Sequence, residues 1–165
     1  MKRPASQIAI EIVDRQRLLR IDRVWLRRVM ADALVGGGIS QAHIGVVLLD
    51  DAGIAELHQR WLGLPGPTDV ITFDLSDGDA AGGLHGDIAV STETARRVAR
   101  ELGWQPKHEL AYYVVHGLLH LAGEDDHDPA DRRRMRAREQ ALMAAAGLPR
   151  PPLARRRAVR NRGDR

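Results

Sequence analysis

Apolar residues recur along the chain with two different periods. Residues 8–13, IAIEIV, alternate and are β-branched, and residues 43–50, HIGVVLLD, form a nearly continuous apolar run. Both patterns predict strands, and the second is typical of a central strand. Between them, residues 24–34 place apolar side chains at helical spacing after Asp22, a favourable N-cap residue. Three consecutive glycines then end this predicted helix.

The rest of the chain continues this succession of strands and helices. A second helix is predicted from Asp51 to about Leu62, where LGLPGP breaks it. The glycine-rich segment 76–84 is expected to be a flexible loop or a hairpin connection. We expect further strands at 70–75 and 86–91, and helices at 92–102, 106–121 and 129–146. The pattern predicts an α+β fold, with about four strands in a small sheet and about five helices.

The composition favours one globular domain. The 165 residues are 44% hydrophobic and contain no cysteine, so any bound metal needs His, Asp or Glu ligands. No stretch approaches the roughly 20 apolar residues of a membrane span, and the N-terminus lacks a signal-peptide pattern. We therefore expect a single domain over residues 1–149, in a soluble and cytoplasmic protein.

The charge is unevenly distributed along the chain. Residues 150–165 contain seven arginines and one acid, a charge of +6 within a total of +3, so residues 1–149 carry −3. Arginines also cluster at 96–100 and 132–138. The basic C-terminal tail is expected to be disordered, and it either only aids solubility or binds a polyanion such as RNA.

The stretch VVHGLLHLAGEDDHD, residues 114–128, carries the candidate chemistry. It ends an almost wholly apolar helix that we expect to be buried. His116 and His120 are four residues apart, so both imidazoles lie on one face and can reach one ion. His127 follows shortly after Gly123, where a turn can bring a third ligand back. A single buried histidine is more often a hydrogen-bonded core residue, but this spacing favours a metal site.

Gly117 limits the kind of metal site this can be. A metalloprotease of the HExxH type needs glutamate directly after the first histidine, where this chain has glycine. Glycine in the middle of a helix also costs about 1 kcal/mol relative to alanine. It is tolerated where another group must approach the helix backbone closely.

The sequence resembles the YbeY-type endoribonucleases, the bacterial rRNA maturation factors also grouped as UPF0054. HGLLHLAGEDDHD is similar to the family motif H-G-x-L-H-L-x-G-Y-D-H. PTDVITFD at 67–74, GDIAVSTETARRVARELG at 86–103 and LLDDAGIAELHQRWLG at 48–63 resemble the family segments that precede this motif. Together they cover residues 43–128 in the family's order.

The resemblance implies both a fold and an activity. The fold is a mixed four-stranded sheet with helices. The activity is zinc-dependent cleavage of single-stranded RNA, with roles in maturation of the 16S rRNA 3′ end and in ribosome quality control. The implied partners are rRNA, the small ribosomal subunit, ribosomal proteins and a ribosome-assembly GTPase. One Zn²⁺ per chain is expected, with His116 and His120 as catalytic metal ligands.

The third metal ligand is open between two neighbours. The family spacing places Asp126 in the ligand position, whereas this chain has its histidine one residue later, at His127. Imidazole nitrogen and carboxylate oxygen are both accepted zinc ligands. On the sequence alone we favour His127, because it keeps three nitrogen ligands.

The second open point is whether this chain replaces an arginine that the family commonly has at the position of residue 62. The family commonly has Tyr-Arg shortly before its P-T-D-V segment, where this chain has Trp61 and Leu62. Arg60 is the candidate to replace that arginine in catalysis or RNA binding. If it does not, the alternative is a ribosome-associated RNA-binding factor with a structural metal and little hydrolytic activity. Thr68 and Asp69 are expected to support the loop structurally, or else to line the floor of the cleft.

Overall fold

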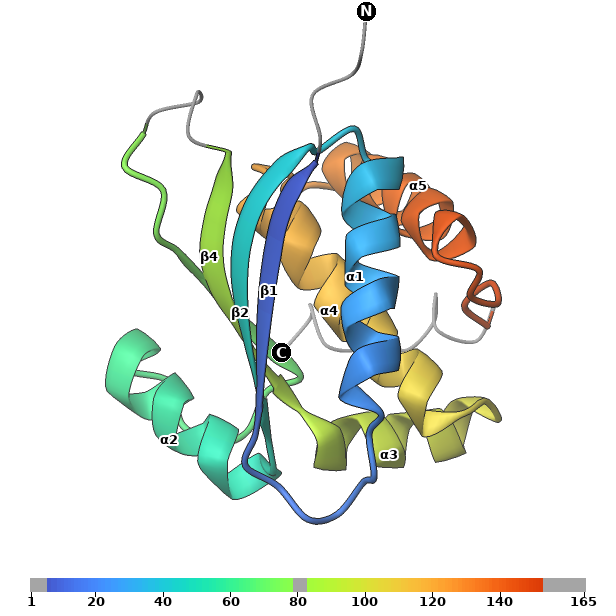
Figure 1. Cartoon of the computed structure of the whole chain (residues 1–165). Coiled ribbons are helices and arrows are strands. Elements are labelled where there is room, and N and C mark those ends of the chain that lie inside the picture. The colour runs from blue at the N-terminus through green and yellow to red at the C-terminus, as the bar shows by residue number, and fades with distance from the viewer. Residues whose placement is uncertain (1–5, 79–82, 153–165) are drawn as a thin grey trace, which may run out of the picture.

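The computed structural model describes residues 6–78 and 83–152, so part of the 76–84 connection and residues 153–165 of the predicted tail lie outside the described residues. The described chain forms four strands and five helices (Figure 1). The strands are β1 (Gln7–Asp14), β2 (Gln41–Leu49), β3 (Val70–Asp74) and β4 (Leu84–Ser91). The helices are α1 (Arg23–Gly36), α2 (Asp51–Leu62), α3 (Thr92–Leu102), α4 (Pro106–Leu121) and α5 (Pro129–Ala145).

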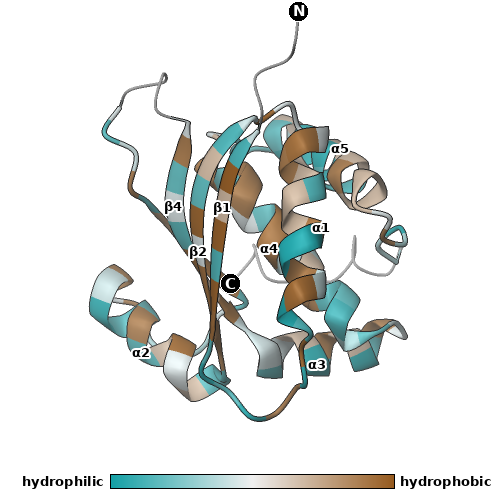
Figure 2. Cartoon of the chain, viewed as in Figure 1, coloured by the Kyte–Doolittle hydropathy of each residue, from teal (hydrophilic) through white to brown (hydrophobic). Residues whose placement is uncertain are grey.

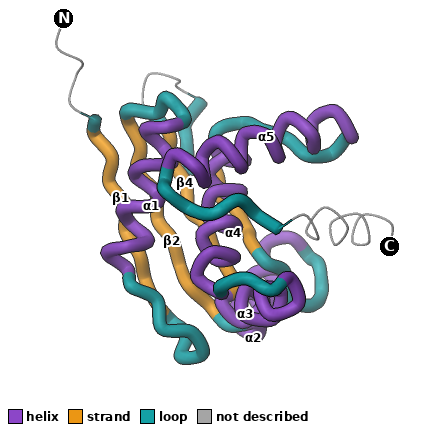
Figure 3. Tube along the Cα trace, turned by 90° about the vertical axis from the view of Figure 1, so that its right-hand side faces the viewer, coloured by secondary structure: helices purple, strands orange, loops and turns teal. Residues whose placement is uncertain are grey.

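The strands form one mixed sheet in the order β1-β2-β4-β3. β1 pairs with β2 and β2 with β4 in parallel, while β3 pairs antiparallel to β4 at the edge. The strands run side by side behind α1 and α4 in the turned view (Figure 3). The predicted α+β class, with a small mixed sheet and five helices, is confirmed.

The helices cover the two faces of the sheet unequally. α1, α4 and α5 lie on one side of the strands and α2 lies on the other (Figure 1). Alternate residues of β2 explain this division, because Ile44, Val46 and Leu48 join the main core while Leu49 joins a small cluster with Ile54 of α2. The strands are accordingly rich in apolar residues (Figure 2).

Local sequence signals set where the helices begin. The side chain of Asp22 accepts hydrogen bonds from the first backbone N–H groups of α1, and Ser91 does the same for α3. Pro106 occupies the first position of α4, where its missing N–H costs nothing. Asp50 caps α2, and Asp128 caps α5. The predicted element boundaries are confirmed to within about two residues.

The buried helix α4 lies close against the sheet. Its residues from Glu109 to Leu121 are buried, apart from His116 and His120, which are partly exposed. A Cβ at Gly117 would lie 3.1 Å from Ile88 Cγ2 and 3.2 Å from Thr72 Cγ2. The close approach expected at Gly117 is therefore made by side chains of β3 and β4.

Among the described residues, no helix combines the length and apolar character needed to cross a membrane.

Candidate metal centre

Two imidazoles on α4 face each other across one helical turn. The Nε2 atoms of His116 and His120 are 3.0 Å apart, and their rings are nearly perpendicular at 82°. The side chains are 22% and 29% exposed, so a small ligand has access to both. The helical spacing thus places both rings on one face of α4, within reach of one ion, as predicted.

The second nitrogen of each ring determines what the facing nitrogens can do. His116 Nδ1 lies 2.6 Å from Glu139 Oε1, and His120 Nδ1 lies 3.1 Å from the backbone carbonyl of Glu124. A carboxylate and a carbonyl only accept hydrogen bonds, so these contacts favour a proton on each Nδ1. In two neutral rings both Nε2 atoms then present lone pairs to each other. Only a proton or a cation between them makes this arrangement favourable, and that fits a metal site.

Asp126 completes a cluster of three metal-ligating side chains. Its Oδ2 lies 3.8 Å from His116 Nε2, and its Oδ1 lies 3.9 Å from His120 Nε2. One ligand atom from each residue falls within 4.8 Å of the others. Ligand atoms bonded to one zinc ion at about 2.0–2.2 Å can be at most about 4.4 Å apart. The distances measured from Asp126 and between the rings fall within that limit.

His127 lies apart from the histidine pair. Its side chain is 89% exposed, and its Nε2 is 3.7 Å from Asp125 Oδ1. It belongs to a second group of possible ligands with Asp125 and Asp126, and this group does not include the α4 histidines. Of the two alternatives for the third ligand, the structure therefore brings Asp126 to the pair.

Hydrogen bonds hold the loop that carries these two residues. Arg132 Nη1 donates to the carbonyls of Asp126, at 3.3 Å, and His127, at 2.8 Å. Asp125 Oδ1 accepts from the backbone N–H of Asp126 at 2.7 Å. Gly123 begins the turn with a φ of +90°, which an L-amino acid side chain disfavours. These contacts turn Asp126 toward α4 and His127 toward solvent.

The surroundings shift the two histidines in opposite directions. Burial alone lowers the pKa of His116, but the hydrogen bond to Glu139 and the negative charges of Glu139, Asp69 and Asp126 outweigh it and raise that pKa. Burial and the neighbouring His116 lower the pKa of His120. The surroundings therefore favour the charged form of His116 and disfavour that of His120.

Asp69 and Arg60 occupy different places relative to this cluster. Asp69 lies near enough for its charge to act on His116 and Tyr112. Its side chain also accepts from the backbone N–H of Val70 at 2.9 Å, which orders the start of β3. Arg60, in contrast, lies at the end of α2 and lines a hollow with Val13 and Leu57. The structure does not bring Arg60 to the histidine pair.

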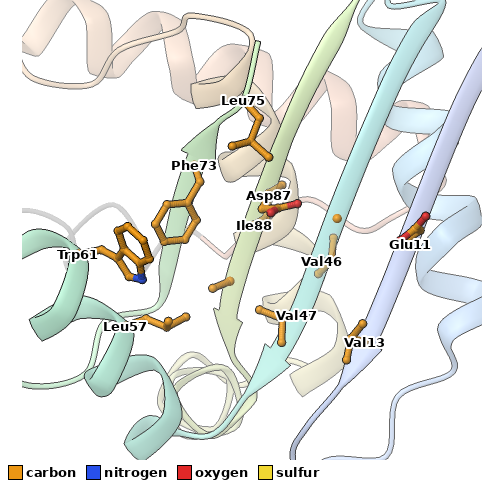
Figure 4. A pocket seen from close by; sticks show the side chains of 12 residues that line it. Glu11, Val13, Val46, Val47, Leu57, Trp61, Phe73, Leu75, Asp87 and Ile88 are labelled. Carbon is orange, nitrogen blue, oxygen red and sulfur yellow. The ribbon is translucent and has the colours of Figure 1, made fainter. Parts of the chain in front are cut away.

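The α2 side of the sheet carries a larger hollow of about 560 Å³. Leu57 and Trp61 line it from α2, and Phe73 and Asp87 line it from the sheet (Figure 4). The Trp61 and Phe73 rings meet edge to face at 6.1 Å. Trp61 thus contributes to this apolar hollow and not to the metal cluster.

Glu139 is the residue near the cluster that sequence reasoning missed. It lies on α5, 23 residues after His116 and outside the histidine motif. A signal was present, because Met135, Leu142 and Met143 are buried on the same stripe of α5 and Glu139 interrupts it with a carboxylate. A lone acid on a core-facing stripe indicates a polar partner inside the protein.

Comparison with known proteins places these residues in a family context. The family model described as endoribonuclease YbeY matches residues 7–147, which include the cluster and Glu139. An endoribonuclease YbeY of Anaeromyxobacter sp. (strain Fw109-5) is 42% identical over 123 residues, 74% of this chain and 64% of that relative. One of Rhodopseudomonas palustris (strain BisB18) is 34% identical over 154 residues, 90% of this chain and 92% of that relative. The chain thus spans less than two thirds of the first relative and nearly all of the second.

A solved structure shares the fold. The solution structure of TM1509 from Thermotoga maritima superimposes with a TM-score of 0.56 at 27% sequence identity. The match covers 82% of this chain and 89% of the other.

Proposed function

The chain belongs to the YbeY family of endoribonucleases, and from this premise we propose that it is a zinc-dependent hydrolase that cuts single-stranded RNA. The observation that carries the proposal is the pair of Nε2 atoms 3.0 Å apart, each with its Nδ1 hydrogen-bonded to an acceptor. In such a pair, the two Nε2 lone pairs can bind one cation between them. Histidine and aspartate are ligands that zinc accepts.

We assign the metal to His116, His120 and Asp126, in preference to His127. The 3.8 and 3.9 Å distances from Asp126 to the two rings and the exposed position of His127 support this choice. Three protein ligands leave a fourth position for water or substrate, as in catalytic zinc sites. A bound zinc ion would supply a Lewis acid and lower the pKa of water at that position.

The chain's own residues hold this arrangement and attract the substrate. Arg132 fixes the backbone on which Asp126 is carried, through two carbonyl groups. The negative charge of Asp69 favours a cation near His116. Arg133, exposed on α5, and the tail arginines offer positive charge to RNA phosphates. We propose no contact with substrate for Arg60, because it lines the α2 side of the sheet.

The cellular role follows from the family resemblance. We propose that the substrate is ribosomal RNA, in maturation of the 16S rRNA 3′ end and in ribosome quality control in the cytoplasm. Partners on the small ribosomal subunit, including ribosomal proteins and an assembly GTPase, belong to the same proposal.

A second candidate function rests on Leu62, shortly before the P-T-D-V segment at residues 67–70. Leu62 stands where the family commonly has arginine, and Arg60 lies away from the histidines. A ribosome-associated RNA-binding factor with a structural metal would not need that arginine.

Metal content and cleavage of a single-stranded RNA separate the two functions. We expect about one zinc per chain in the untagged protein, as the cluster predicts for a single three-ligand site. His116→Ala and His120→Ala should lose both zinc and cleavage while keeping their circular dichroism spectrum. Zinc and RNA binding without cleavage by the parent would favour the RNA-binding factor. Absence of zinc after loading and removal of excess would contradict the metal site itself.

A further inference from the structure

A buried carboxylate on α5 joins two side chains of α4. Glu139 is 3% exposed. Its Oε1 lies 2.6 Å from His116 Nδ1, and its Oε2 accepts from the Tyr112 hydroxyl at 2.5 Å. Both oxygens are therefore used by residues of the helix that carries the metal ligands.

The position of Glu139 is otherwise apolar. Met135 and Met143, one turn before and after it, are buried to 1% and 0% exposure. A carboxylate among such neighbours loses its hydration and is unfavourable unless hydrogen bonds compensate. An apolar residue would serve packing alone at least as well. The contacts with Tyr112 and His116 therefore indicate a purpose other than core stability.

We infer that Glu139 is a positioning residue of the metal site, which holds the His116 ring with its proton on Nδ1 and its Nε2 lone pair directed at the metal. The inference rests on the proposed function of His116 as a ligand. Metal-bound histidines generally donate their other N–H to a carboxylate or a carbonyl, which fixes both tautomer and ring orientation. Tyr112 in turn fixes the carboxylate, because its hydroxyl holds the second oxygen.

The two ligands are supported by different chemistry. His120 donates to a backbone carbonyl, that of Glu124, which no substitution removes. His116 depends on the side chain of Glu139, which a substitution does remove. The support of His116 can thus be tested separately from the ligand itself.

Zinc affinity, measured by competition with a chelator, tests the inference on the full chain. We expect Glu139→Leu to weaken zinc binding by about 10–100-fold, the usual effect of losing such a partner. Glu139→Gln keeps an acceptor for Nδ1–H and should fall between this variant and the parent. Glu109→Gln is the matched control, because Glu109 is as deeply buried on α4 but accepts from Trp104 Nε1. It should bind zinc as the parent does.

Nuclear magnetic resonance of the histidine ring nitrogens reads the tautomer directly. In the metal-free parent at alkaline pH, His116 should carry its proton on Nδ1. In the zinc-loaded parent that proton should give a protected downfield signal. Glu139→Leu should lose the protected signal, and Glu109→Gln should keep it. A merely structural role for Glu139 would not move this signal selectively.

Several results would overturn the inference. A His116 proton on Nε2 in the parent would do so, and this measurement needs no variant to fold. So would zinc binding by Glu139→Leu as tight as the parent's. If the parent binds zinc and cuts RNA while Glu139→Leu matches it, only the inference fails. If the parent binds no zinc, the proposed metal site fails first and the role of Glu139 fails with it.

Discussion

At the scale of single residues, two neighbours in the loop after α4 have different environments. Asp126 approaches both Nε2 atoms, whereas His127 is 89% exposed and lies beside Asp125. Asp126→Ala should therefore weaken zinc binding by more than the roughly 10–100-fold typical of an outer-shell partner, because it removes a ligand. His127→Ala should leave the affinity nearly unchanged. Chelator competition on both metal-loaded variants measures the difference.

The two variants are controls for each other, since they alter adjacent residues of one loop. A larger loss of zinc affinity in His127→Ala than in Asp126→Ala would contradict the ligand set proposed above. It would mean that metal binding rearranges the loop that Arg132 holds.

The sequence predicted part of this site. The spacing of His116 and His120 was sufficient, because a helix of fixed geometry places the rings together. The sequence could not show which of Asp126 and His127 faces the histidine pair. The loop conformation that decides this depends on hydrogen bonds from Arg132, which lies on another helix. Glu139 was missed for a related reason, since its contact with His116 exists only after α5 packs on α4.

At the scale of elements, one carboxylate joins the starts of α2 and α3. Asp51 Oδ1 accepts from the hydroxyls of Ser91 and Thr94, both at 2.6 Å, and Oδ2 accepts from Arg97 at 2.9 Å. Burial would raise the pKa of Asp51, but these hydrogen bonds outweigh it and lower the pKa below 3.8. The folded protein thus stabilises the ionised carboxylate of Asp51 more than the unfolded chain does.

This difference predicts a pH dependence of stability. A lowered carboxyl pKa stabilises the fold above the unfolded pKa, and the contribution is lost as the pH falls through the folded value. Asp51→Asn should therefore lower the free energy of unfolding by about 1–3 kcal/mol near neutral pH, and by less below about pH 4. Urea unfolding of the metal-free protein at several pH values measures it. Asp22→Asn, which keeps a good N-cap for α1, is the control. An equal loss at every pH would contradict the explanation.

The contact of β4 with its neighbours gives a second prediction at this scale. A Cβ at Gly86 would lie 2.6 Å from Leu121 Cδ2 and 2.7 Å from the carbonyl oxygen of Phe73. Gly86→Ala should destabilise the protein by about 1–3 kcal/mol, because the backbone of β3 cannot move aside cheaply. In Gly45→Ala the new Cβ meets only the carboxylate end of exposed Asp87, which can turn away. Urea unfolding should rank the two variants in that order, and a reversed order would contradict this account of the packing.

Element boundaries were the most predictable feature of the fold. Asp22, Ser91 and Pro106 mark helix starts through contacts within a few residues, so local sequence contains the whole signal. The strands β2 and β4 begin two residues before their predicted positions, at Gln41 and Leu84. Pairing between the strands fixes those ends, as where Ala42 pairs with Leu84. The local sequence pattern contains no information on such pairing.

At the scale of the whole molecule, basic segments follow the metal cluster along the chain. His116 and His120 lie on α4 and Asp126 lies in the loop before α5, and α5 carries five arginines at positions 132–138. Two of these already pair with acids, Arg134 with Asp131 and Arg138 with Glu124. The positive charge that remains for RNA therefore depends strongly on the C-terminal tail, which has six arginines and one aspartate over residues 153–165.

Removal of residues 153–165 tests that dependence while retaining the chain through Pro152. This truncation also keeps Arg150 in its hydrogen bond with Gln140. If the tail binds RNA, affinity for a single-stranded RNA should fall. The slope of log affinity against log salt should flatten by about 0.7 for each phosphate that the shortened protein no longer neutralises. A full-length chain with all six tail arginines changed to glutamine separates charge from length, and it should match the truncation. Unchanged affinity and slope in both proteins would leave the tail a solubilising role and place RNA binding on the folded domain.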